Sequence, residues 1–259
     1  MFVLHTYRRF RPTVLAAFAL GLALTLAPAA MAADLYMVSV GITNAKGLSK
    51  LTATAKDARD MAKWAHTQEK KMFSRVFVST LTDNQATKSN ILNALSGLRS
   101  RVKAGDYVIF YESSHGGLNK SGEFVMNAYD GTVSFREMAA ALKGVAGNKI
   151  VIIDACHSGE AATSGAGAEL VVFSSSRSNQ LSFDGVAGGN SRFTQYFLAG
   201  LYGKADYNKD RAITLQEAAT YSANRLKDVN KGRAVKDQQD MMWSVPTRTP
   251  GTLRLASVQ

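Results

Sequence analysis

Two residues with complementary acid–base chemistry follow apolar runs in this 259-residue sequence. The run at 107–111 leads to His115, and the run at 150–153 leads to Cys156, the only cysteine of the chain. A thiol is only slightly ionised at neutral pH, and a neighbouring imidazole can take its proton to generate a thiolate nucleophile. Cys156 and His115 are therefore a candidate nucleophile and general base, although each alone could be an inert core or surface residue.

The elements around these residues must bring them together, and the hydrophobic pattern alternates between strands and helices. Buried strands are predicted at 35–42, 75–78, 107–111, 150–153 and 170–173. Helices are predicted at 54–68, 91–102, 138–142, 193–201 and 215–226. This alternation predicts an α/β fold with a mostly parallel central sheet and helices on both faces. Ligands of such sheets bind beyond the carboxyl ends of the strands, where both candidate residues lie.

Helix starts are marked by capping residues. Ser134 and Glu137 have the spacing of a capping box, and Thr87 is expected to cap the helix that follows it.

The first 32 residues have the pattern of a secretory signal peptide. Basic residues at 8–11 precede a 13-residue apolar run at 14–26, and small residues end at Ala32. The run is shorter than the roughly 20 residues that span a membrane. We expect cleavage after Ala32, which leaves a periplasmic or secreted domain over 33–259. Removing three arginines from the net charge of +11 leaves about +8.

The composition narrows the function class. Hydrophobic residues make up 46% and charged residues 20%, as in an ordinary globular protein. A single cysteine excludes an internal disulfide and a cysteine-rich metal site. The basic excess has no nucleic-acid motif beside it, so we expect neither a nucleic-acid partner nor membrane association after signal removal. The oligomeric state stays open.

The segments around both candidate residues resemble the hallmark segments of caspase-like cysteine peptidases (clan CD, peptidase C14), and most closely those of metacaspases and their bacterial relatives. Asp154 and 156–159 reproduce the family pattern Asp-x-Cys-His-Ser-Gly. The segment 107–117 resembles the pattern aromatic-Ser-Gly-His-Gly, with Ser114 in place of the first glycine. The resemblance extends over about 35–226 and implies a caspase-like three-layer sandwich.

The resemblance also implies catalytic roles. Cys156 would be the nucleophile and His115 the general acid and base, while the backbone N–H groups of Gly116 and Cys156 would form the oxyanion hole. No cofactor is required for this chemistry. The alternatives are a non-catalytic binding module on the same fold, and an asparagine-specific or transpeptidase relative of the same clan.

The specificity pocket implied by the resemblance is acidic in this sequence. Asp57 and Asp154 occupy positions where an aspartate-specific caspase would need basic residues, and Ser113 lies nearby. Buried carboxylates favour a cationic partner, so we expect peptide or protein substrates cleaved after Arg or Lys. Asp57 could alternatively lie on a solvated face of its helix.

The stretch 160–169 is rich in small residues and is predicted to be a flexible loop. Caspases are cut in this region, between their large and small halves. No Lys, Arg or Asp lies between Cys156 and Arg177, so an enzyme specific for basic residues could not cut itself here. We therefore expect a single uncut chain.

A second motif has the spacing of a calcium-binding loop. Its candidate ligands are Asp206, Asn208, Asp210 and Glu217. The sixth position of such loops is glycine, and here it is Arg211. The alternative is a surface turn before a helix that is capped by Thr214 and Glu217. Calcium is therefore a possible ligand.

Overall fold

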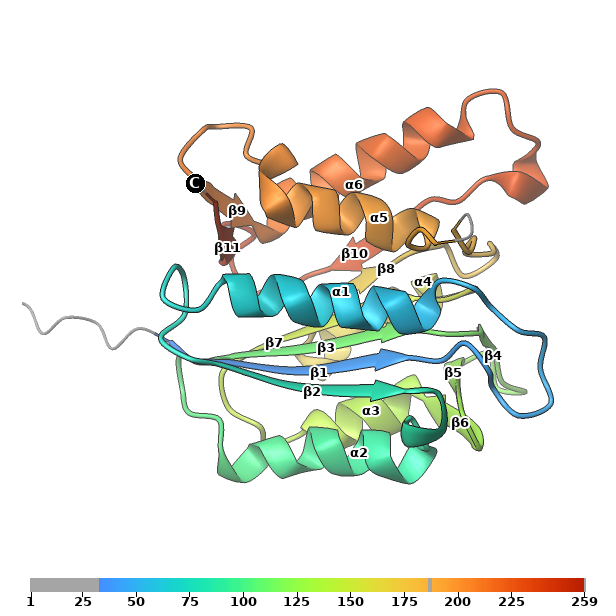
Figure 1. Ribbon diagram of the computed structural model, residues 1–259, viewed down its shortest axis with the longest axis horizontal. Helices are drawn as coiled ribbons and strands as arrows, with labels where there is room; N and C mark the ends of the chain where they lie inside the picture. Colours follow the sequence, from blue (N-terminus) through green and yellow to red (C-terminus); the bar gives the residue numbers. More distant parts are fainter. Residues whose placement is uncertain (1–32, 186–187, 259) are drawn as a thin grey trace, which may run out of the picture. The chain divides into compact units, whose positions relative to one another are not determined.

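A six-stranded sheet forms the centre of the protein (Figure 1), as seen in a computed structural model that describes residues 33–185 and 188–258. Its strands are β1 (Leu35–Gly41), β2 (Val76–Thr82), β3 (Tyr107–Ser113), β7 (Asn148–Asp154), β8 (Val171–Ser174) and β10 (Met242–Ser244). Their order in the sheet is β10-β8-β7-β3-β1-β2. All pair in parallel except β10, which runs antiparallel to β8 at one edge. The predicted signal peptide, residues 1–32, lies outside the described residues.

Helices cover both faces of this sheet and form the outer layers (Figure 1). One face is covered by α1 (Thr54–Thr67), α5 (Arg192–Ala199) and α6 (Leu215–Asn230). The other face is covered by α2 (Lys88–Ser96), α3 (Phe135–Leu142) and α4 (Gly159–Gly165). The predicted three-layer α/β fold is confirmed. None of the helices in the described part of the chain is long and apolar enough to cross a membrane.

The remaining elements are short. A three-stranded sheet contains β4 (Gly116–Leu118), β5 (Phe124–Ala128) and β6 (Gly131–Ser134), and β9 (Ala212–Thr214) pairs with β11 (Arg254–Ser257). A π-helical turn, Gly200–Lys204, follows α5. Single 3-10 turns lie at Asp83–Gln85, Gly97–Ser100, Ala166–Ala168 and Val235–Asp237.

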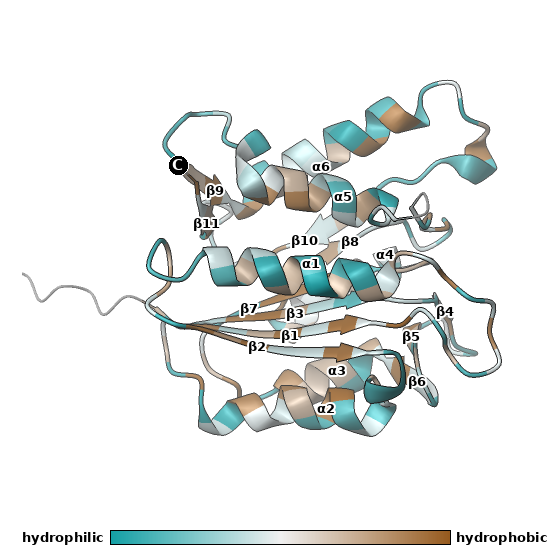
Figure 2. Cartoon of the chain, in the orientation of Figure 1, coloured by the Kyte–Doolittle hydropathy of each residue, from teal (hydrophilic) through white to brown (hydrophobic). Residues whose placement is uncertain are grey.

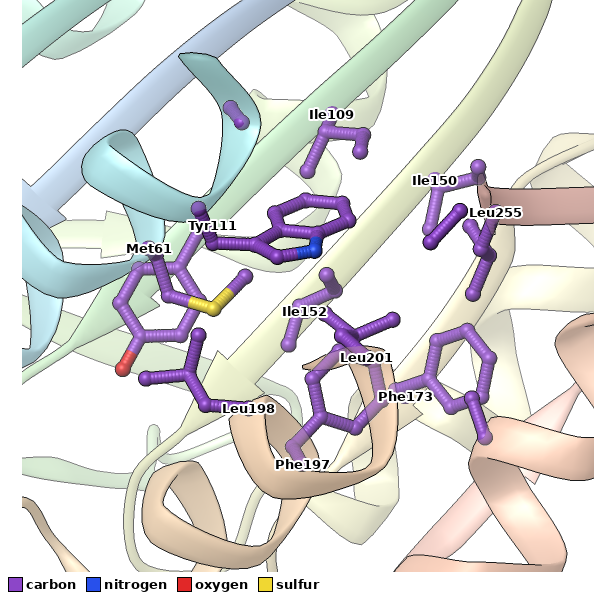
Figure 3. Close-up of a cluster of buried hydrophobic side chains, with 14 of the residues drawn as sticks. Met61, Ile109, Tyr111, Ile150, Ile152, Phe173, Phe197, Leu198, Leu201 and Leu255 are labelled. Carbon is purple, nitrogen blue, oxygen red and sulfur yellow. The ribbon is translucent and has the colours of Figure 1, made fainter. Parts of the chain in front are cut away.

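The core is split into two layers because side chains alternate along each strand. Leu35 and Met37 of β1 pack in the layer below α1 and α5, whereas Tyr36 and Val38 pack in the layer above α2 and α3. Figure 3 shows the first layer, and Figure 2 shows the apolar colour of the strands between more polar helices. The inner strands β1, β3, β7 and β8 are largely buried on both faces, which explains why their sequences are continuous apolar runs.

The predicted helix caps are present. The Thr87 hydroxyl accepts a hydrogen bond from the Asn90 N–H (3.2 Å). Ser134 and Glu137 form a reciprocal capping box at the start of α3. Side-chain acceptors satisfy N–H groups that the first turn of a helix leaves without partners.

The prediction of a flexible loop at 160–169 is wrong. Helix α4 occupies most of this stretch, and Ala161 and Ala162 are buried against the sheet. Gly165 lies so close to the Val172 side chain of β8 that a Cβ would collide with it. The small residues that suggested a loop instead allow close packing of a helix on a strand.

Gly41 ends β1 beneath the start of α1, and this close approach requires glycine. A Cβ on Gly41 would lie 2.8 Å from Ala55 Cα and would also strike the Thr54 carbonyl, both of which are backbone. We expect Gly41→Ala to lower the free energy of unfolding by about 1–3 kcal/mol, because the backbone of α1 cannot move aside without distorting its packing on the end of β1. Urea unfolding followed by circular dichroism measures this change.

Gly97 provides the matched control. It follows α2 with φ −65°, and an added Cβ would meet nothing within 4 Å. Gly97→Ala should be neutral or stabilise by about 0.4–1 kcal/mol through the unfolded state. Equal losses in the two variants would contradict the packing argument.

Candidate active site

The two candidate catalytic residues lie just beyond adjacent parallel strands. In the register of β3 and β7, Ser113 stands opposite Asp154. His115 and Cys156 each follow two residues later, and all four residues line the same pocket. The sequence prediction that these side chains share one edge of the sheet is confirmed.

Gly116 allows the two segments to approach each other. A Cβ on Gly116 would lie 2.7 Å from both the Cys156 carbonyl oxygen and Ala155 Cβ. Any other residue would push the segment after His115 away from the segment that carries Cys156. The backbone N–H groups of Gly116 and Cys156 therefore belong to neighbouring segments, as a shared oxyanion site requires. Their role as an oxyanion hole stays a prediction.

The imidazole of His115 is held by a backbone group that the sequence could not reveal. Its Nε2 lies 2.8 Å from the Ser49 carbonyl oxygen. A carbonyl oxygen can only accept, so Nε2 carries the proton and the neutral ring keeps its lone pair on Nδ1. This contact leaves Nδ1 as the nitrogen that can accept a proton, and the carbonyl would stabilise the imidazolium that results.

The Cys156 thiol is half-buried and contacts one residue of the loop that follows β8. The Ser182 backbone N–H donates to Sγ at 3.4 Å, and the Ser182 carbonyl oxygen lies 3.6 Å from Sγ. Burial raises the pKa of the thiol above its ordinary value, whereas the N–H donor opposes this rise. In this state the nucleophile is a neutral thiol that needs a base.

Asp154 ends β7 as a buried carboxylate with neutral donors. The Ser182 hydroxyl donates to Oδ1 (2.7 Å), and the Thr194 hydroxyl and N–H donate to Oδ2 (2.7 and 3.2 Å). Burial raises its pKa despite these hydrogen bonds. Among the described residues no Lys, Arg or His forms a salt bridge with this carboxylate, which lines the pocket beside Ser113.

Asp57, on the first turn of α1, is fully buried and not solvated as the alternative interpretation required. Its carboxylate accepts hydrogen bonds from Ser113 Oγ (3.0 Å), the Ser191 N–H (3.0 Å) and Asn190 Nδ2 (2.9 Å). Burial and the nearby charge of Asp154 raise its pKa to about 7. Asp57 lies behind Ser113 and Ser191, which line the pocket themselves.

The pocket is small, and hydrogen bonds join two loops beside it. Its volume is about 30 Å³. The Asp184 carboxylate accepts hydrogen bonds from the Thr52 hydroxyl (2.7 Å) and the Ala53 N–H (3.0 Å). This joins the loop before α1 to the loop after Ser182.

The predicted calcium loop has four candidate ligands: Asp206, Asn208, Asp210 and Glu217. Oxygens of the first three accept N–H groups within the turn, and Glu217 forms a capping box with Thr214. Arg211 has φ 63°, the left-handed conformation for which glycine is favoured. In the described residues, no group of three or more His, Cys, Asp or Glu side chains could hold a metal ion. The four candidate ligands do not converge into one cluster here, and calcium binding stays a prediction.

Glu112 is a buried acid beneath the site that sequence analysis did not single out. It is fully buried near the end of β3, and its Oε1 lacks a hydrogen-bond partner in the described structure. Its Oε2 accepts from Ser114 Oγ (2.8 Å), the residue that departs from the family glycine. Burial raises the pKa of Glu112 to about 8, so its side chain is mostly neutral at pH 7.

Comparisons with known proteins agree with this fold. The sequence profile of the family described as "Caspase domain" (Peptidase C14) matches residues 37–249. The structure is similar to the crystal structure of protein GSU0716 from Geobacter sulfurreducens, with a TM-score of 0.65. The two are 18% identical over 86% of this chain and 97% of that chain, a level that shows a shared fold alone. A search of the curated proteins gave no match.

The buried acid makes stability depend on pH. The pKa of Glu112 is raised from 4.5 to about 8 on folding, so its contribution is complete below about pH 4.5 and is lost as the pH rises to 8. Glu112→Gln keeps a neutral group there. Its free energy of unfolding relative to wild type should rise by several kcal/mol between pH 5 and pH 8. Urea unfolding at both values measures this difference.

Glu69→Gln, at an exposed position, is the control and should show no such divergence. A constant difference between Glu112→Gln and wild type across this range would mean that Glu112 is ionised in the folded protein.

Proposed function

The chain belongs to the caspase domain family, Peptidase C14, and we propose that it is an exported cysteine endopeptidase that cleaves after Arg or Lys. One observation carries this proposal. The Cys156 thiol, the His115 imidazole and the Asp154 carboxylate line a single pocket. A nucleophile, a base and an anionic subsite are the three parts that such an enzyme needs. Export rests on the pattern of residues 1–32.

In the proposed reaction, His115 Nδ1 takes the proton of Cys156 as Sγ attacks the scissile carbonyl carbon. The carbonyl oxygen becomes an oxyanion between the N–H groups of Gly116 and Cys156. The C–N bond then breaks, and His115 returns the proton to the leaving amine. A water molecule hydrolyses the acyl-enzyme by the same steps, with His115 again as the base.

Specificity follows from the charge of the subsite. Asp57 and Asp154 are buried and have neutral hydrogen-bond donors, and the nearby charge of Asp154 adds to the effect of burial in raising the pKa of Asp57. A guanidinium or ammonium group would relieve this repulsion, whereas an aspartate side chain would add to it. Asp154 is reached directly from the pocket, and Asp57 would be reached once Ser191 moves aside.

The proposed enzyme acts as one uncut chain. The region where caspases are cut is helix α4, whose buried alanines fix it against the sheet. The sequence between Cys156 and Arg177, which includes this helix, contains no Lys or Arg. Self-cleavage after a basic residue therefore has no site between the two halves.

Peptide hydrolysis tests the reaction. The freshly reduced wild-type protein should release the fluorophore from an Arg-ended peptide, and Cys156→Ala should not, because only the thiol can form the acyl-enzyme.

Mass spectrometry of the active sample should show a chain uncut near 161–167. Assays with calcium and with a chelator separately test the predicted metal.

Other peptides separate the alternatives. Release from an Asn-ended peptide in place of the Arg-ended one would indicate the asparagine-specific relative. Absence of cleavage of every peptide, with Cys156 intact, would favour the binding module and end the peptidase proposal.

The subsite predicts a pH dependence. Cation binding needs ionised Asp57, so kcat/KM for the Arg-ended peptide should fall as the pH drops below about 7. Asp57→Asn should reduce kcat/KM about 100-fold or more at pH 8, because a buried ion pair is lost. Steady-state kinetics measures both effects. Asp228→Asn, on the exposed end of α6, should leave the rate unchanged. An unchanged kcat/KM in folded Asp57→Asn would exclude Asp57 from the subsite.

A further inference from the structure

Gln239 is a fully buried amide in the segment between α6 and β10, and all its side-chain hydrogen bonds go to the region around the thiol. Its Oε1 accepts from the Phe183 N–H (3.2 Å). Its Nε2 donates to the Ser175 carbonyl oxygen and to Ser182 Oγ, each at 3.0 Å. The amide therefore fixes two consecutive residues of the loop after β8.

Gln239 is itself held on its backbone side. The Asn230 side chain, at the end of α6, accepts from the Gln239 N–H (2.9 Å) and donates to the Gln239 carbonyl oxygen (3.1 Å). This pair of bonds holds the backbone of Gln239 against the end of α6. The rigid end of α6 is thus connected through Gln239 to the loop.

Ser182 accepts a hydrogen bond from the Gln239 amide, and it also forms hydrogen bonds with the nucleophile Cys156 and the subsite residue Asp154. Among the described residues, 33–185 and 188–258, the Ser182 N–H is the one group that donates a hydrogen bond to Cys156 Sγ. Its hydroxyl donates to Asp154 Oδ1 (2.7 Å) and accepts from Ser175 Oγ (2.9 Å). A shift of Ser182 would therefore disturb the thiol and the anionic subsite together.

The Ser182 N–H matters because a thiolate at this place has few other means of stabilisation. Burial disfavours the thiolate, and the Ser182 carbonyl oxygen favours the neutral thiol. The ionisable groups that line the pocket with Cys156 are His115, Asp154 and Asp184. Two of these three are acids, whose charge opposes a second negative charge. An N–H aimed at sulfur favours the charged form.

We propose that Gln239 is a positioning residue that holds the Ser182 N–H against Cys156 Sγ and so favours the thiolate of the nucleophile. Gln239 does not line the pocket and acts through the residues that its side chain bonds, Ser175, Ser182 and Phe183. The inference deepens the proposed function of the same site, yet it concerns the ionisation of the thiol, which can be measured without any peptide.

The test is the rate of Cys156 alkylation by iodoacetamide as a function of pH, in wild type and Gln239→Met. Methionine has a similar length but cannot hydrogen bond to Phe183 or Ser182. We expect alkylation at pH 7 to be about tenfold slower, with the midpoint of the profile moved to higher pH and the plateau at high pH unchanged.

Gln238→Met is the matched control. The Gln238 side chain donates to the Arg233 carbonyl oxygen (3.1 Å), away from the thiol, and its loss should leave the profile as in wild type. A wild-type profile for folded Gln239→Met would overturn the inference. Should that variant fail to fold, Ser182→Ala takes its place. It keeps the N–H but removes the hydroxyl anchor, and an unmoved midpoint there would be equally decisive.

The outcome is separable from that of the proposed function. A shifted midpoint in a protein that cleaves no basic peptide would keep the positioning role of Gln239 and reject the peptidase. Cleavage of Arg-ended peptides with an unshifted midpoint would reject the positioning role alone.

Discussion

The parallel pairing of β3 with β7 is the constraint from which the site follows. Because Ser113 lies opposite Asp154, the chain leaves both strands at the same level and sets His115 and Cys156 beside one pocket. A slip of one residue would turn Asp154 toward the other face of the sheet. The register is kept by apolar side chains in both core layers, so the two halves of the hydrophobic core hold the chemical groups in place.

Placing charge at this edge has an energetic cost. Asp57, Asp154 and Glu112 are all buried, and the pKa of each is raised. Neutral hydroxyl and amide donors offset part of the desolvation, but among the described residues none of the three acids forms a salt bridge. Sites of function commonly retain such unfavourable groups. Here the cost falls on one acid that lines the pocket of the thiol, Asp154, and on two acids behind residues that line it, Asp57 and Glu112.

The sequence was most informative where one residue type has one physical explanation. Continuous apolar runs identified the parallel strands, and Ser134 with Glu137 identified a helix start. Cys156 and His115 were found because their side chains carry the chemistry. The Ser49 carbonyl was missed because every residue has one, and only the fold brings it to His115. Gln239 was missed because a buried amide looks like any surface glutamine, and α4 because alanine and glycine serve both loops and tight packing.

Helix α4 also has a consequence for how the site is assembled. It connects β7, which ends at Asp154, to β8, from which the chain continues to Ser182. With this covalent connection intact, the strand carrying the nucleophile and the strand leading to its hydrogen-bond donor meet at an effective concentration set by a short tether. Their pairing is therefore a first-order event within one molecule, and dilution of the protein does not separate them.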